Sequence, residues 1–158
     1  MNSSKHQWAV PLAARRAEDS GYGHVCLEVR LNAGRNAVIY VVEHDEAVRD
    51  ALATLLESIG YEVEAFGTAS DFLRAHRPGV QGCLLVDLDL PEMDGPELIG
   101  ILVARRIKLP AVLMSGRMRN RRLQRHLPPG VVAILEKPFG DHELLERIEF
   151  ALGKPRTH

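Results

Sequence analysis

The stretch Leu84-Leu85-Val86-Asp87-Leu88-Asp89-Leu90-Pro91-Glu92-Met93-Asp94-Gly95 decides the fold of this chain. Its apolar run ends in the carboxylate Asp87, and a proline and an Asp-Gly pair follow soon afterwards. This pattern is typical of a buried parallel strand that ends at the mouth of a sheet and runs into a turn. Ligands gather at such carboxyl ends in open α/β sheets, and an Asp placed there can attack phosphorus as a nucleophile. Taken alone, Asp87 could equally cap a helix or close a turn.

The composition describes one soluble domain. The chain has 158 residues, of which 46% are hydrophobic and 26% charged, and its net charge of -1 favours neither nucleic acid nor an anionic membrane. No apolar run approaches the roughly 20 residues of a membrane span, and no signal-peptide core begins the chain. Cys26 and Cys83 lie in different kinds of segment and do not suggest a disulfide framework. We therefore expect a cytoplasmic protein with no membrane partner.

The chain is expected to contain one folded domain with a short addition at each end. In residues 1–36, Ser, Gly, Asn and Arg mix with scattered apolar residues without sustained periodicity. This part is predicted to be a flexible N-terminal extension. The regular pattern predicts a domain over residues 37–153, and residues 154–158 form a C-terminal tail.

Apolar runs alternate with helical periodicity from Val38 onward. The expected strands cover residues 38–42, 61–66, 83–87, 111–114 and 131–135. Five helices are expected between and after these strands. The first stops at Gly60, the second is capped by Ser70 and continues to Arg77, and the third runs from Pro96 to Arg105. The fourth is basic and ends at Leu127, and the fifth is capped by Asp141. Short connections between five strands and five helices predict a doubly wound α/β domain with a parallel sheet in the order 2-1-3-4-5.

Polar residues follow several of these strands and would meet at one edge of the sheet. Glu43-His44-Asp45 follows the first strand, Asp87 ends the third, Ser115 ends the fourth and Lys137 follows the fifth. Asp87 could attack phosphorus, and the acids after the first strand could hold a divalent cation. Ser115 could bind one phosphoryl oxygen and Lys137 could neutralise another. Together these residue types indicate a site that handles a phosphoryl group.

Four segments in order resemble the receiver domain of two-component response regulators, across roughly residues 37–153. They are the acidic opening Val41-Val42-Glu43-His44-Asp45-Glu46-Ala47-Val48-Arg49, the segment from Leu85 to Gly95, Met114-Ser115-Gly116 and Leu135-Glu136-Lys137-Pro138-Phe139. The resemblance implies a flavodoxin-like fold in which Asp87 accepts a phosphoryl group from a sensor histidine kinase or phosphotransfer protein. It also implies that Lys137 and Ser115 read the phosphorylated state, and that the Lys137-Pro138 peptide bond is cis.

The resemblance further implies Mg²⁺ as cofactor, held by Glu43, Asp87 and the backbone carbonyl of Asp89. His44 stands where receivers usually carry a second acid, and a neutral imidazole is a poor ligand for this hard cation. Ile134 stands where many receivers carry an aromatic ring that moves on phosphorylation. Switching is therefore expected to run through Ser115 and loop movement, or to be weak.

Arginines crowd the segment after Ser115 and have two interpretations. They could form an ordinary solvated helix face. Alternatively, the face from Arg117 to Lys137 docks an acidic output protein, whereas the absence of interleaved aromatic residues argues against nucleic acid. Because only residues 154–158 follow Gly153, a single-domain protein that acts through protein contacts or phosphoryl relay is expected.

Three functions remain open from the sequence. The leading hypothesis is a phosphorylation-controlled signalling module that is not an enzyme. A second is a pseudo-receiver, a binding module with weak or no phosphorylation, which rests on His44 and Ile134. A third is a phosphatase that resembles the haloacid dehalogenase superfamily, whose Asp-x-Asp opening Asp87-Leu88-Asp89 would match. A complete strand–helix unit before Asp87 argues against this third hypothesis.

Overall fold

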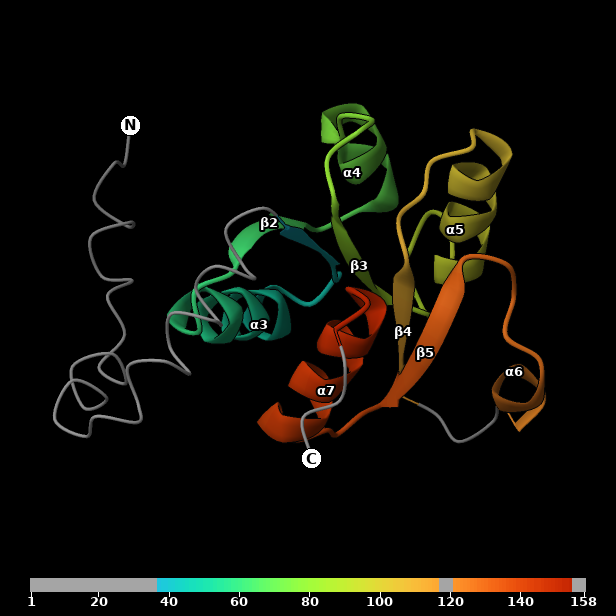
Figure 1. The fold of residues 1–158 in the computed structure, drawn as a ribbon. Helices are drawn as coiled ribbons and strands as arrows, with labels where there is room; N and C mark the ends of the chain where they lie inside the picture. The colour runs from blue at the N-terminus through green and yellow to red at the C-terminus, as the bar shows by residue number, and fades with distance from the viewer. Residues whose placement is uncertain (1–36, 117–120, 155–158) are drawn as a thin grey trace, which may run out of the picture.

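Five strands form one parallel β-sheet in the computed structural model, which describes residues 37–116 and 121–154. The strands are β1 (Val38–Val42), β2 (Glu62–Phe66), β3 (Gly82–Asp87), β4 (Ala111–Ser115) and β5 (Val131–Glu136). Their order is β2-β1-β3-β4-β5, as the sequence predicted (Figure 1). The predicted N-terminal extension lies outside the described residues.

Helices cover both faces of this sheet. The helices are α3 (Glu46–Ser58), α4 (Ala69–Ala75), α5 (Gly95–Ala104), α6 (Arg121–Arg125) and α7 (Asp141–Ala151). Buried residues of α3 and α7 pack with one set of strand side chains, and those of α4 and α5 pack with the alternate set. Each central strand is therefore buried on both faces, which explains why β1, β3 and β4 are continuous apolar runs.

The strand register aligns the carboxyl ends of neighbouring strands. Val42 of β1 pairs with Phe66 and Val86, so the residue after each of these strand positions lies at the same edge of the sheet. Asp87 is in turn paired with Met114, and Ser115 is paired with Glu136. The edge from Glu43 to Lys137 is therefore built by residues that are far apart in sequence.

Two predicted helix caps are wrong. Thr68, not Ser70, caps α4, because its hydroxyl accepts a hydrogen bond from the backbone N–H of Asp71. Asp141 is the first residue of α7 rather than its cap, and the preceding Gly140 occupies the cap position without a side-chain bond. In both cases the side chain that could cap the helix lies beyond the position where the backbone becomes helical.

Several helix ends also differ by a few residues from those predicted. Helix α4 ends at Ala75 and α5 spans Gly95–Ala104, with Asp94 as the cap that accepts from the N–H of Glu97. The basic helix is a short segment, Arg121–Arg125. Within the described parts of the chain, no helix is long and apolar enough to cross a membrane.

Candidate functional site

Asp87 is the last residue of β3 and is 7% exposed. Its Oδ1 accepts a hydrogen bond from the backbone N–H of Asp89 at 3.2 Å. Its Oδ2 lies 3.3 Å from the ammonium nitrogen of Lys137. The carboxylate is thus held in one orientation at the carboxyl edge of the sheet, where the sequence predicted a nucleophile.

Glu43 and Lys137 complete the centre of the site. Glu43 follows β1 and is 1% exposed. Its Oε1 accepts from the N–H of Asp45 at 3.1 Å, and its Oε2 accepts from Nζ of Lys137 at 2.8 Å. One ammonium, from the segment after β5, therefore bridges two buried carboxylates at the ends of the neighbouring strands β1 and β3.

The charges of this cluster shift the pKa values of its members. Burial raises the pKa of the Asp87 carboxyl and the negative charge of Glu43 raises it further, while Lys137 and the amide of Asp89 oppose the shift without cancelling it. Burial by itself would lower the pKa of Lys137, but hydrogen bonding and attraction to Glu43 and Asp87 outweigh it and raise that pKa. The lysine therefore stays charged beside the carboxylates.

Ser115 ends β4 at the same edge and is buried. Its backbone carbonyl accepts a hydrogen bond from the N–H of Lys137 at 2.8 Å, which joins the two segments predicted to bind phosphoryl oxygens. The Lys137-Pro138 peptide bond is cis, as predicted. The structure thus brings Glu43, Asp87, Ser115 and Lys137 together at one edge of the sheet.

The loop after β3 packs tightly beneath Asp87. The N–H of Gly95 donates to the carbonyl of Leu88 at 3.1 Å. A Cβ at Gly95 would lie 2.6 Å from the carbonyl oxygen of Asp87, closer than real Cβ atoms approach. Only glycine fits this approach without a shift of the backbone, so the packing beneath Asp87 requires glycine at position 95. The sequence predicts only a turn at Gly95.

Arg49 organises the loop after β1 and was not identified as a site residue from the sequence. Its guanidinium donates to the carbonyl oxygen of Glu43 at 3.0 Å and to that of His44 at 3.4 Å. These bonds fix the backbone that carries the buried acid, while the His44 side chain is exposed. The sequence signal for this role is the position of Arg49 about one helical turn after Asp45, which caps α3. That spacing places Arg49 on the side of the helix that carries the cap.

The donor atoms at the site suit a hard divalent cation in part. Two buried carboxylates share one ammonium, which leaves an excess negative charge that a cation would balance. Among the residues that the structure describes, however, no three His, Cys, Asp or Glu side chains gather as a metal cluster. Mg²⁺ keeps several waters and binds proteins through few carboxylates, so Glu43 and Asp87 with a backbone oxygen can hold it.

Ile134 lies in β5 and is partly buried against the sheet face covered by α4 and α5. Its aliphatic side chain has no ring that could turn inward.

Comparisons with known proteins agree with this geometry. A family model described as the response regulator receiver domain matches residues 39–149. Nodulation protein W of Bradyrhizobium diazoefficiens is 35% identical over 124 residues, which cover 78% of this chain and 55% of that protein. Transcriptional regulatory protein FixJ of the same species is 38% identical over 115 residues, covering 72% of this chain and 56% of FixJ. The chain spans about half the length of these curated relatives.

Solved structures show the same fold. The response regulator StyR superposes with a TM-score of 0.66 at 37% identity, covering 75% of this chain and 60% of StyR. The N-terminal FixJ crystal structure superposes with a TM-score of 0.67 at 28% identity, covering 78% of this chain and 99% of that one. The family match includes Asp87, Ser115 and Lys137. The chain belongs to the response regulator receiver family.

Proposed function

We propose that Asp87 accepts a phosphoryl group from a histidine of a sensor kinase or phosphotransfer protein. The observation that carries this proposal is the bridge from Lys137 to both Asp87, at 3.3 Å, and Glu43, at 2.8 Å. A carboxylate that is held beside a fixed cation at the mouth of a parallel sheet is a nucleophile with a binding place for the group it receives.

In the proposed reaction, one oxygen of the Asp87 carboxylate attacks phosphorus in line with the phosphorus–nitrogen bond of the donor. A phosphorus–oxygen bond forms, and the electron pair of the broken bond stays on the donor imidazole, which takes a proton from water. Lys137 neutralises charge on the phosphoryl oxygens, and Ser115 is positioned at the adjacent strand end to donate to another. The Asp89 amide orients the nucleophile throughout.

The proposed cofactor is Mg²⁺, held by Glu43, Asp87 and the carbonyl of Asp89. When bound, the cation would offset the repulsion between the carboxylates and the incoming phosphoryl oxygens. The exposed side chain of His44 occupies the position of a second acid and contributes little to this pocket.

A groove beside the site is suited to the phosphodonor. It lies between α3 and the segment after β5, has a volume of about 990 Å³ and is lined by apolar side chains that include Val48, Leu55 and Phe139. Lys137 forms part of its wall. A helix of the donor that packs in this groove would bring a phosphohistidine to Asp87.

The proposed output is contact with another protein through the surface of α6, β5 and α7. Leu127 and Phe150 are 42% and 48% exposed there, and both line a hollow with Ile134. Exposed apolar side chains beside the basic residues Arg122 and Arg125 suit an acidic partner with an apolar anchor. In this proposal the protein acts in the cytoplasm as a signalling module and not as an enzyme.

The pseudo-receiver is the second candidate. Exposure of His44 and the aliphatic packing of Ile134 favour it, because the first weakens metal binding and the second removes a moving ring. The two functions differ in whether Asp87 becomes phosphorylated.

Intact mass spectrometry after incubation with acetyl phosphate and Mg²⁺ separates these functions. The expected result is the gain of one phosphoryl group, which is absent in Asp87→Asn and retained in the matched control Asp50→Asn, whose carboxylate is exposed on α3. No gain, even at high Mg²⁺ and with a histidine-phosphorylated donor, would support the pseudo-receiver. For the output surface, charge reversal at Arg121 and Arg122 should weaken partner binding without changing phosphorylation of Asp87.

A further inference from the structure

We propose that a cavity at the sheet edge opposite Asp87 is a docking site for an acidic polypeptide segment that carries an apolar side chain. This site would be a second interaction surface, and it does not depend on phosphorylation of Asp87. The proposal rests on the cavity, on the charge around it and on the backbone of one arginine.

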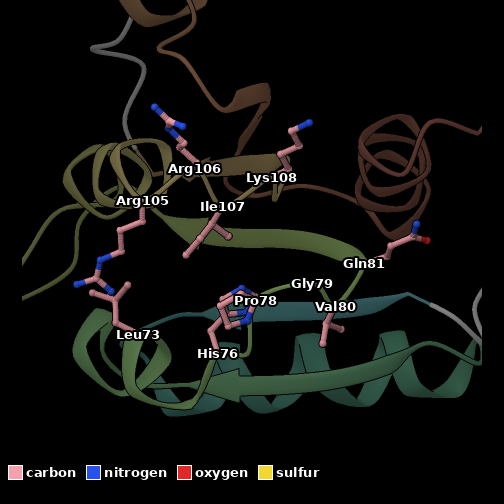
Figure 2. A pocket seen from close by; sticks show the side chains of 10 residues that line it. All are labelled: Leu73, His76, Pro78, Gly79, Val80, Gln81, Arg105, Arg106, Ile107 and Lys108. Atoms are coloured by element: carbon pink, nitrogen blue, oxygen red, sulfur yellow. The ribbon is translucent and has the colours of Figure 1, made fainter.

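The cavity lies between the loop that leads from α4 into β3 and the loop that leads from α5 into β4 (Figure 2). It has a volume of about 550 Å³, within the range of known ligand pockets. Its apolar lining comes from Leu73, Pro78, Val80 and Ile107. Val80 is 37% exposed and Ile107 is half-buried, so the apolar surface can be reached from solvent.

The charge at the cavity has one sign. Arg105, Arg106 and Lys108 line it and are exposed, and none of the described residues that line it is acidic. The whole chain, by contrast, has a net charge of -1. An excess of positive charge beside apolar surface is complementary to an acidic segment with an apolar anchor.

Arg106 adds an independent observation because its backbone is left-handed, with φ of 57°. The ends of α3 and α7 use glycine at comparable positions, Gly60 with φ of 103° and Gly153 with φ of 73°. Glycine adopts this conformation without the crowding that a Cβ introduces, so an arginine here is strained. Strained residues cluster at functional sites, and arginine at this position adds a positive charge at the rim of the cavity, which Arg106 lines.

The arrangement of the cations favours an extended segment over a compact anion. Figure 2 shows the Arg105 side chain directed toward Leu73 of α4, while those of Arg106 and Lys108 extend away from α4. The three cations therefore surround no single point where a phosphate could bind them all. A peptide that lies along the loop from Arg105 to Lys108 could pair with them in turn while one side chain enters the cavity.

Two other occupants fit less well. Residues 1–36 precede β1, whose first residue, Val38, donates its N–H to the carbonyl of Gln81 in the cavity wall. They carry five Lys or Arg and three Asp or Glu, so their charge has the same sign as the cavity. Single-stranded nucleic acid is matched in charge, but the cavity lining has no Phe, Tyr or Trp on which bases could stack, and the ring of His76, which also lines it, already stacks on Phe72.

The test uses the full chain and a fluorescein-labelled peptide, Glu-Asp-Glu-Leu-Asp-Glu-Asp. We expect weak binding, with a Kd of roughly 0.1–1 mM at low salt that weakens as salt screens the charges. In NMR spectra, the amide shifts should be largest at Val80 and Ile107. A peptide with Ser in place of Leu should bind about fivefold more weakly, because the apolar anchor is lost.

Matched variants locate the site. Arg105→Glu should weaken peptide binding about five- to tenfold, whereas Arg122→Glu, which reverses an exposed charge on α6, should change it less than about twofold. Arg106→Gly should weaken binding and raise the thermal unfolding midpoint together, because it removes both the charge and the backbone strain. Replacing a purely structural residue would lower the unfolding midpoint, so weaker binding together with a higher midpoint indicates that Arg106 has a binding role.

The proposal is overturned by unchanged peptide affinity in Arg105→Glu and Arg106→Gly, or by shifts confined to α6. Equal affinity for the Ser peptide would also overturn it, since the cavity would then have no role. Oligothymidylate that binds more tightly than the peptide, with the same shifts at Val80 and Ile107, would assign the site to nucleic acid instead.

Discussion

The ammonium nitrogen of Lys137 lies 2.8 Å from Oε2 of Glu43, a residue 94 positions away in sequence. The two strands that these residues follow, β5 and β1, are separated in the sheet by β3 and β4. The lysine side chain therefore spans the carboxyl ends of both middle strands and passes Asp87, from which it is 3.3 Å away. This ammonium therefore offsets part of the negative charge of the two carboxylates.

Removal of the Lys137 charge should destabilise the domain and disable the site. In Lys137→Met, two buried carboxylates would face each other without a cation, at a cost of about 1–2 kcal/mol once the 27% exposure of the lysine side chain is allowed for. Phosphorylation of Asp87 should slow more than about tenfold, as for loss of a charge-stabilising group. Urea unfolding and intact mass measure the two effects.

The pH dependence of this variant distinguishes charge repulsion from lost packing. Without the cation, the pKa of Asp87 in the folded state rises further, so the folded protein binds a proton more readily than the unfolded one and the loss of stability shrinks as pH falls. Lys137→Arg, which retains the charge, is the control and should lose less stability. A loss that is the same at pH 5 and pH 7.5 would contradict this account.

Gly95 and Gly100 form a matched pair within α5. Gly95→Ala should destabilise the protein by about 1–3 kcal/mol, because the new Cβ would lie 2.6 Å from the carbonyl oxygen of Asp87 and 3.0 Å from a methyl group of Leu113. A Cβ at Gly100 meets nothing within 4 Å, so Gly100→Ala should stabilise by about 0.5–1 kcal/mol. Chemical denaturation of both variants is the measurement, and equal effects would mean that the approach beneath Asp87 relaxes easily.

His44→Asp should strengthen Mg²⁺ binding by about 5- to 30-fold, because the new carboxylate adds one negative charge beside the cation. His44→Asn keeps the position neutral and is the control. Titration with Mg²⁺ at several pH values, followed by NMR shifts, gives the result; equal affinity in all three proteins would place His44 away from the metal.

His76 should make stability fall as the solution becomes acidic. Burial lowers the pKa of its imidazole, and the nearby Glu64 opposes this only partly. The unfolded chain therefore binds a proton at a higher pH than the folded protein, so stability decreases as pH falls from about 7.5 through the reference value near 6.5.

His76→Gln removes this titration without adding a charge. The thermal unfolding midpoint of the wild-type protein, relative to that of His76→Gln, should drop between about pH 7.5 and pH 5.5. A constant difference between the two proteins across this range would show that the imidazole titrates alike in the folded and unfolded states.

The strands, their order and the meeting of four polar residues at one edge of the sheet were predictable from the sequence. Continuous apolar runs mark strands that are buried on both faces, and the polar residue that ends each run must lie at the sheet edge because the chain then leaves the core. Asp87, Ser115, Glu43 and Lys137 could therefore be placed at one edge from spacing alone. The predicted helix ends were less accurate, because Thr68 and Ser70 are both good caps and only the backbone path selects between them.

The tertiary structure alone decided the contacts that give the site its chemistry. Spacing along the chain cannot show that Lys137 bridges Glu43 and Asp87, because side-chain reach depends on how far apart the strands lie. It also cannot show that Arg49 holds the carbonyl of Glu43, or that Gly95 has no room for a Cβ beneath Asp87. The cavity beside Arg105 could not be predicted from the sequence either. Its walls come from two loops that are brought together only by the packing of α4 and α5 against the sheet. Local patterns fix which residues are buried, whereas distances between separate segments are fixed by packing.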